Sequence, residues 1–164
     1  LNYRLSYFCI FNTKVMQALR TAVSTLIDDE SLSVGERLEQ ICELLRNEVD
    51  HYDWVGFYFH ENDTQTLKLR AFAGEPTDHT TIPFGKGICG QVALSNQNFI
   101  VPDVSAQDNY IACSLTVKSE IVIPLFKDGK NIGQIDIDSH QLDPFTDADV
   151  ALLEFINQRI AEIL

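Results

Sequence analysis

The sequence predicts a single α+β domain in which helices from both ends of the chain cover one face of a central antiparallel sheet. Three observations support this fold class. The chain has 164 residues, the length of one ordinary domain. Apolar residues recur at helical spacing near both ends, whereas the middle of the chain is mostly strand-like. Asp128-Gly129 separates two strand-like segments and is a strong signal for a tight hairpin turn. Strands flanked by terminal helices favour an α+β domain with an antiparallel sheet.

Three long helices are expected from their apolar stripes. Ser33 with Glu36 forms a capping box before the second helix, and Thr146 with Asp149 resembles one before the last, with the shorter acid. The helices are expected over about Thr13–Ile27, Val34–Val49 and Asp147–Leu164. Their inward-facing residues are Val15, Leu19, Ala22, Val23 and Leu26 in the first, Val34, Leu38, Ile41, Cys42, Leu45 and Val49 in the second, and Leu152, Leu153, Ile156, Ile160 and Ile163 in the last.

Strands fill most of the segment between the second and last helices. Asn62-Asp63 supplies turn chemistry between the first two strands, and Gly87–Ser95 is expected to open a short helix after a glycine-rich turn. With the long helices sharing one face of the sheet, the other face is left for a ligand. The strands are expected over Trp54–His60, Leu67–Ala73, Phe99–Val101, Glu120–Phe126 and Asn131–Ile137.

Composition excludes several classes of function. The net charge of -12 disfavours binding to nucleic acid through phosphates. No segment approaches the roughly 18 consecutive apolar residues of a membrane-spanning helix, so no membrane partner is expected. The four cysteines form neither a disulfide framework nor a Cys/His spacing typical of zinc, so no metal is expected and a reducing cytoplasm fits best.

The first fifteen residues do not resemble the rest of the chain. They are aromatic, carry one positive charge at Arg4, and lack the apolar core and cleavage site of a signal peptide. The chain begins with leucine, and its only methionine is Met16. We interpret residues 1–15 as an atypical leader without a functional role, and it could be a fragment end, an artefact or a mis-called start.

Two cysteines stand out among the residues that could carry chemistry. Cys89 ends a glycine-rich turn near an expected helix start, where a thiolate can be stabilised, and Cys113 follows 24 positions later. Asp136 and Asp138 alternate on one face of a hydrophobic strand, which is unfavourable unless that face is wet or meets cations. Together with Glu120, these residues predict a small pocket for redox chemistry and a cationic ligand group.

Six segments in order carry a resemblance to a known family. The chain resembles the free methionine-(R)-sulfoxide reductases, a family built on the GAF fold, over about residues 30–164. The resemblance implies one GAF domain, which we place at residues 16–164. The segments are Asp53-Trp54-Val55-Gly56-Phe57-Tyr58, Ile82-Pro83-Phe84-Gly85-Lys86-Gly87-Ile88-Cys89-Gly90, Val101-Pro102-Asp103-Val104, Ile111-Ala112-Cys113, Ser119-Glu120-Ile121-Val122 and Asp136-Ile137-Asp138-Ser139.

The resemblance implies a reaction and roles for particular residues. Members reduce the R epimer of free methionine sulfoxide, a repair of oxidative damage, and Cys113 matches their catalytic cysteine. The sulfenic acid left on that cysteine would condense with a second thiol to a disulfide, which a thioredoxin-type reductant would reset. No bound cofactor is expected, and a homodimer is implied. Glu120, Asp136 and Asp138 match the pocket carboxylates, and Trp54 and Tyr58 match its aromatic wall. Alternation independently places Trp54, Gly56 and Tyr58 on one strand face.

The chain also departs from the family. His79 stands ten positions before Cys89, where most members carry another cysteine, so the usual partner in the disulfide is missing. Cys89 could take over as resolving thiol, an external thiol could attack the sulfenic acid directly, or activity could be lost. Residues flanking Cys113 differ as well, with Asn109-Tyr110 before and Ser114 after Ile-Ala-Cys.

Plainer interpretations stay open for these residues. Cys42 is interpreted as core, and Cys89 could equally pack its helix on the sheet. The four histidines are interpreted as solvated, although His79 could serve as a proton donor. For the whole chain, the alternative is a non-catalytic GAF domain that binds a small metabolite as a sensor, and a weaker one is a structural dimerisation module.

Overall fold

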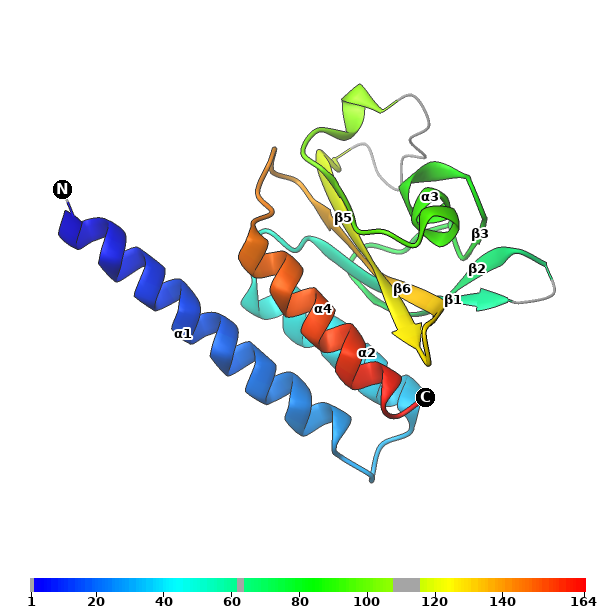
Figure 1. The fold of residues 1–164 in the computed structure, drawn as a ribbon, viewed down its shortest axis with the longest axis horizontal. Coiled ribbons are helices and arrows are strands. Elements are labelled where there is room, and N and C mark those ends of the chain that lie inside the picture. Colours follow the sequence, from blue (N-terminus) through cyan, green and yellow to red (C-terminus); the bar gives the residue numbers. More distant parts are fainter. Residues whose placement is uncertain (1, 62–63, 108–115) are drawn as a thin grey trace.

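Helices lie on both faces of one sheet (Figure 1). The computed structural model describes residues 2–61, 64–107 and 116–164, with side chains from residue 14 onward. The helices are α1 (Asn2–Ile27), α2 (Val34–Glu48), α3 (Gly87–Ser95) and α4 (Asp147–Ala161), with a short 3-10 helix, η1 (Val104–Ala106). The strands are β1 (Trp54–Glu61), β2 (Thr66–Ala73), β3 (Thr81–Pro83), β4 (Phe99–Val101), β5 (Ser119–Lys127) and β6 (Lys130–Ser139).

The described strands form one antiparallel six-stranded sheet in the order β3-β2-β1-β6-β5-β4, which confirms the predicted fold class. The five predicted strands correspond to β1, β2, β4, β5 and β6; β3 was not predicted, because three residues are too few to show alternation. Asp128 and Gly129 have φ of 50° and 75°, the left-handed backbone that a two-residue hairpin turn requires, as predicted. The turn predicted at Asn62-Asp63 lies outside the described residues.

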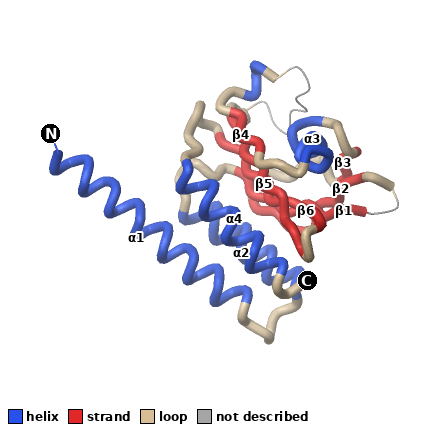
Figure 2. The backbone as a smooth tube through the Cα atoms, viewed as in Figure 1, coloured by secondary structure: helices blue, strands red, loops and turns tan. Residues whose placement is uncertain are grey.

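The terminal helices cover one face of the sheet, as predicted. α2 and α4 lie on the strands, whereas α1 packs on α2 and α4 as an outer layer (Figure 2). Both capping boxes form, at Ser33 with Glu36 and at Thr146 with Asp149. Cys42 is buried with the inward-facing residues of α2, which confirms its assignment to the core, and burial raises the pKa of its thiol. None of the helices in the described part of the chain has the length and apolar character needed to cross a membrane.

Three helix ends differ from the prediction, and for α2 the difference is one residue, with its end at Glu48 rather than Val49. α1 begins at Asn2 rather than near Thr13, so the boundary predicted between residues 15 and 16 falls inside this helix. Residues 2–12 contain neither glycine nor proline, and a helix can therefore continue through them without an apolar stripe. α4 ends at Ala161 rather than Leu164, because the amides of Glu162 and Ile163 bond three residues back and tighten the last turn.

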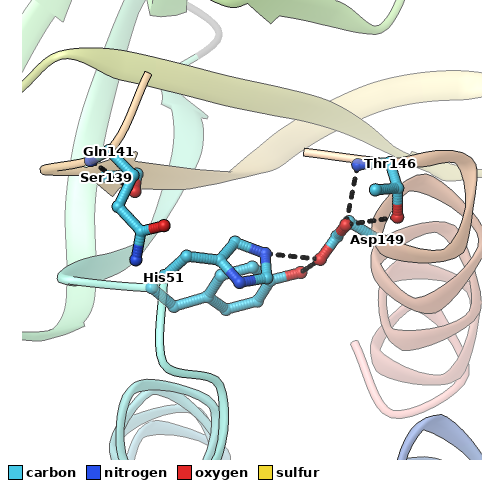
Figure 3. A network of polar contacts seen from close by, with 6 residues as sticks. His51, Ser139, Gln141, Thr146 and Asp149 are labelled. Atoms are coloured by element: carbon cyan, nitrogen blue, oxygen red, sulfur yellow. Dashed lines mark hydrogen bonds and ion pairs between the residues drawn. The ribbon is translucent and has the colours of Figure 1, made fainter. Parts of the chain in front are cut away.

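A buried aspartate at the start of α4 forms hydrogen bonds with the segment before β1. Asp149 Oδ1 accepts from Tyr52 Oη at 2.9 Å and lies 3.0 Å from His51 Nε2. Its other oxygen, Oδ2, accepts from the amide and hydroxyl of Thr146 at 2.8 and 2.7 Å (Figure 3). Burial opposes ionisation of Asp149, but the hydrogen bonds from His51, Thr146 and Tyr52 together lower its pKa. The prediction that His51 is solvated is therefore wrong.

The opposite face of the sheet carries a second, smaller core. α3 lies on this face (Figure 2), and Cys89 and Ile88 of α3 pack there with Trp54 and Tyr58 of β1. The predicted ligand face is thus partly covered by one short helix.

Candidate active site

Sheet register brings the predicted acids onto the α3 side of the sheet. Trp54 pairs with Asp138, and Asp138 pairs on its other side with Glu120, so these residues form one row across β1, β6 and β5. Gly56 of β1 pairs in the same way with Asp136 of β6, in the next row on the same face of the sheet. Because residues two apart on a strand share a face, the three carboxylates gather on one surface.

A glycine turn sets α3 close to the sheet. Gly85 and Gly87 have φ of 82° and 60°, a backbone conformation that favours glycine. The Gly85 amide donates to the Gly90 carbonyl at 2.7 Å. A Cβ on Gly90 would lie 2.6 Å from the Pro83 carbonyl oxygen, so any larger residue would push α3 away from β3. The turn thereby holds Cys89, in the first turn of α3, against the acids.

Cys89, Glu120 and Asp136 meet in one cavity. The Cys89 thiol donates to Asp136 Oδ2 at 3.1 Å, and Glu120 is also hydrogen-bonded to Asp136. The three residues are only 4%, 4% and 2% exposed. His79, Ile82, Lys86, Gly87 and Ile88 complete the lining of this cavity.

Burial keeps protons on these carboxyl groups. Burial raises the pKa of Asp136 to about 7, although hydrogen bonds from Cys89 and Glu120 oppose the rise. The pKa of Glu120 lies well above its ordinary value because of burial and the nearby charges of Asp136 and Asp138. Burial and the charges of Asp136 and Asp53 likewise raise the pKa of Asp138. At neutral pH the cluster therefore shares protons and can donate one to a ligand.

The cluster lacks a positive partner within the described part of the chain. No lysine, arginine or histidine there forms an ion pair with Glu120, Asp136 or Asp138. One oxygen of Asp136 and one of Asp138 are buried without a hydrogen-bond partner among these residues. Such oxygens are unfavourable unless a ligand completes them, so the site suits a cationic group.

The predicted aromatic residues lie beside the acids. Trp54 stacks on Phe72 with ring centroids 5.8 Å apart, and its Nε1 donates to the Glu75 carbonyl at 3.1 Å. Tyr58 is fully buried, and its hydroxyl donates to the backbone carbonyl of His79 at 2.9 Å. A Cβ on Gly56 would lie 2.2 Å from the Trp54 ring, so the indole lies across that glycine.

The acids divide between two neighbouring cavities, a feature that the prediction of one pocket missed. Asp138 and Trp54 line the second cavity, together with Arg46 and His140. His140 lies 3.3 Å from Asp53, with Nδ1 facing the carboxylate. Arg46 and His140 come from α2 and from the loop after β6, and no sequence pattern linked them to the site.

The structure thus brings together Cys89, Glu120 and Asp136 in one cavity, with Trp54, Tyr58 and Asp138 adjoining. Cys113, the predicted nucleophile, lies outside the described residues. The role assigned to each of these residues stays a prediction.

Comparison with known proteins places this geometry in a family. A GAF domain family profile matches residues 31–164. The free methionine-R-sulfoxide reductase of Escherichia coli is 35% identical over 142 residues, covering 84% of each chain. The free methionine-R-sulfoxide reductase of Neisseria meningitidis, solved with its substrate, superposes with a TM-score of 0.83 at 33% identity, covering 90% of this chain and 86% of that one. The Staphylococcus aureus enzyme, in complex with substrate, superposes with a TM-score of 0.80 at 38% identity, covering 90% and 94%.

Proposed function

The chain belongs to the free methionine-R-sulfoxide reductases, a family of GAF domains, and on that premise we propose that it reduces free L-methionine-(R)-sulfoxide to methionine. The observation that supports this most directly is the Cys89 thiol, held 3.1 Å from Asp136 in a buried acidic cavity. A thiol beside proton-sharing carboxyls and a site for a cation is the chemistry that this zwitterionic substrate needs.

The first step places Cys113 as the nucleophile. Its thiolate attacks the sulfoxide sulfur, the oxygen passes to the cysteine, and methionine leaves. The substrate sulfur gains two electrons and the cysteine sulfur loses two, becoming a sulfenic acid. The sulfoxide oxygen needs a proton as its bond to sulfur breaks. A protonated carboxyl of the cluster supplies that proton, because burial keeps the pKa of these groups high.

The carboxylates would also hold the substrate. An ammonium group placed among Glu120, Asp136 and Asp138 satisfies the partnerless oxygens and favours ionisation of the acids. Trp54 and Tyr58 would form the apolar wall for the S-methyl end, because both are buried on the same sheet face as the acids. The substrate's two ends are then recognised by different sides of one site.

Cys89 is the resolving thiol in this proposal. Its sulfur attacks the Cys113 sulfenic acid, a disulfide forms, and water is released. His79 occupies the position of the cysteine that most members carry, and Cys89 is the thiol that the described residues contribute to the cavity lining. A thioredoxin-type dithiol in the reducing cytoplasm then restores both thiols, without a bound cofactor. We propose a homodimer, as the resemblance implies.

The test is an NADPH-coupled thioredoxin assay on free L-methionine-(R)-sulfoxide. The wild-type chain should turn over with either thioredoxin or dithiothreitol, and Cys113→Ser should abolish turnover with both. Cys89→Ser should keep activity with dithiothreitol and lose it with thioredoxin, because a small thiol can reduce the sulfenic acid directly. A folded wild-type protein that binds methionine sulfoxide without turnover would overturn the proposal in favour of a non-catalytic binding domain.

A further inference from the structure

Three potential metal ligands from three separate elements meet in the Cys89 cavity. Cys89 of α3, Glu120 of β5 and Asp136 of β6 each offer one ligand atom, and these atoms all lie within 4.8 Å of one another. All three residues are buried. The set combines one sulfur with two carboxylate oxygens, a mixture that zinc accepts.

A separate observation indicates that this cluster is incomplete. Asp136 is only 2% exposed, lines the cavity, and has its Oδ1 without a hydrogen-bond partner among the described residues. Lys86 lines the same cavity but makes no ion pair with Glu120 or Asp136. A divalent cation at the centre of the cluster would neutralise the carboxylates and place a positive charge beside the partnerless Oδ1.

The spacing of the atoms suits a small tetrahedral ion. Zinc bonds sulfur at about 2.3 Å and carboxylate oxygen at about 2.0–2.2 Å, which places neighbouring ligand atoms roughly 3.5 Å apart. Cys89 Sγ and Asp136 Oδ2 are already 3.1 Å apart. The third ligand atom, from Glu120, lies within 4.8 Å of the other two. A side-chain movement of roughly one ångström therefore brings it into range of the same ion.

We propose that Cys89, Glu120 and Asp136 bind a divalent transition-metal ion, with Zn²⁺ as the chemical type and the fourth position open to water. On binding, the Cys89 thiol and the protonated carboxyl groups of Glu120 and Asp136 release their protons to solvent, and a zinc–thiolate bond forms without oxidation of either partner. The sulfur ligand favours Zn²⁺ over Ca²⁺ and Mg²⁺, which prefer oxygen alone.

The bound ion would act as a reversible inhibitor, which goes beyond the proposed reaction. A metal-bound Cys89 thiolate is withdrawn from disulfide exchange, and Glu120 and Asp136 are no longer available to an ammonium group. The metal site itself does not depend on the proposed reaction, because it needs neither substrate nor Cys113.

Metal binding tests the site directly. The full chain, reduced and freed of metal, is titrated with Zn²⁺ against a chromophoric chelator, without substrate or reductant. One ion per chain should bind with a dissociation constant of about 1 μM or below. Co²⁺ in place of Zn²⁺ should give a near-ultraviolet thiolate-to-cobalt band. Cys89→Ser should remove that band, and Cys89→Ser and Asp136→Asn should each weaken Zn²⁺ binding at least about tenfold, with circular dichroism confirming that they fold.

Two controls keep the result specific. Cys42→Ser removes a buried thiol remote from the cluster, and Cys113→Ser removes the proposed nucleophile; neither should change Zn²⁺ binding. Zn²⁺ should also protect Cys89 of the wild-type chain from alkylation, read by peptide mass spectrometry. The proposal is overturned if Cys89→Ser binds Zn²⁺ as tightly as wild type, if Cys113→Ser alone abolishes binding, or if the wild-type chain binds no Zn²⁺. The Zn²⁺-binding measurements do not depend on reductase activity, so an inactive protein would leave their outcome unchanged.

Discussion

Replacing Asp136 with asparagine should stabilise the ligand-free protein at neutral and alkaline pH. Asp136 is 2% exposed, and burial raises its pKa from 3.8 to about 7. The folded state therefore holds a proton that the unfolded chain releases between about pH 4 and pH 7. The stability that this proton maintains is fully present below pH 4 and is lost as the pH rises through 7. Asp136→Asn removes the ionisation, and an amide oxygen can still accept from the Cys89 thiol.

The magnitude follows from the pKa difference. The folded and unfolded values differ by about three pH units, and each unit corresponds to roughly 1.4 kcal/mol. Ionising Asp136 thus costs the folded state about 4 kcal/mol at pH 8 and almost nothing at pH 4. This is a large share of the 5–15 kcal/mol typical of a domain.

Urea unfolding from pH 4 to pH 8 measures this effect. The free energy of unfolding of Asp136→Asn minus that of wild type should rise with pH by up to about 4 kcal/mol. Taking the difference cancels titrations that the substitution leaves unchanged, including that of Asp149, whose lowered pKa gives the opposite sign. Loss of the Asp136 charge also lowers the pKa of Glu120 and of Asp138, and this adds to the rise with pH. Asp50→Asn, the same change on an exposed acid, is the matched control for the substitution itself. A difference for Asp136→Asn that does not vary with pH would show that Asp136 does not hold a proton in the folded state.

Three further predictions concern other parts of the structure. Gly56→Ala should displace the indole of Trp54, because the new Cβ would lie 2.2 Å from that ring. The substitution should shift the fluorescence of this single tryptophan and weaken the binding of methionine, measured by fluorescence titration. An unchanged fluorescence spectrum would contradict this prediction. Asp149→Asn should cost about 1–3 kcal/mol at pH 7 and less as the pH falls below about 4, since it removes an acceptor whose pKa is lowered. Tyr52→Phe is the milder companion, expected to cost about 1 kcal/mol in the same urea experiment, and equal losses in both variants would be evidence against the network. Cys42 should react with a maleimide only as fast as the protein unfolds, because it is fully buried in the helical core, and fast labelling of the native protein would show otherwise.

Most of the fold could be predicted because its main helices and strands carry clear local sequence patterns. The stripe around Ile41 and Leu45, the capping boxes and the Asp128-Gly129 turn each express their structure within a few residues. β3 is too short to carry a pattern. The start of α1 was missed because residues 2–12 lack an amphipathic repeat, although nothing in them breaks a helix.

The site was predicted less fully because it depends on contacts between distant elements. Alternation placed Asp136 and Asp138 on one face, but only the register with Glu120 and the approach of α3 bring Cys89 to 3.1 Å from Asp136. The cysteines were judged for zinc by sequence spacing alone. That criterion overlooks a thiol that meets carboxylates from two strands in three dimensions. His51 was interpreted as solvated because nothing nearby in sequence indicates Asp149.

A single turnover without reductant tests whether the chain is a reductase that uses Cys89 as its resolving thiol. Reduced protein is mixed with one equivalent of free L-methionine-(R)-sulfoxide, the released methionine is quantified, and the cysteines are mapped by peptide mass spectrometry. We expect one methionine per chain and a disulfide between Cys89 and Cys113, with Cys42 still reduced. Release of methionine without involvement of Cys89 would contradict its role as resolving thiol. A protein that binds the sulfoxide and releases no methionine would contradict the reductase itself.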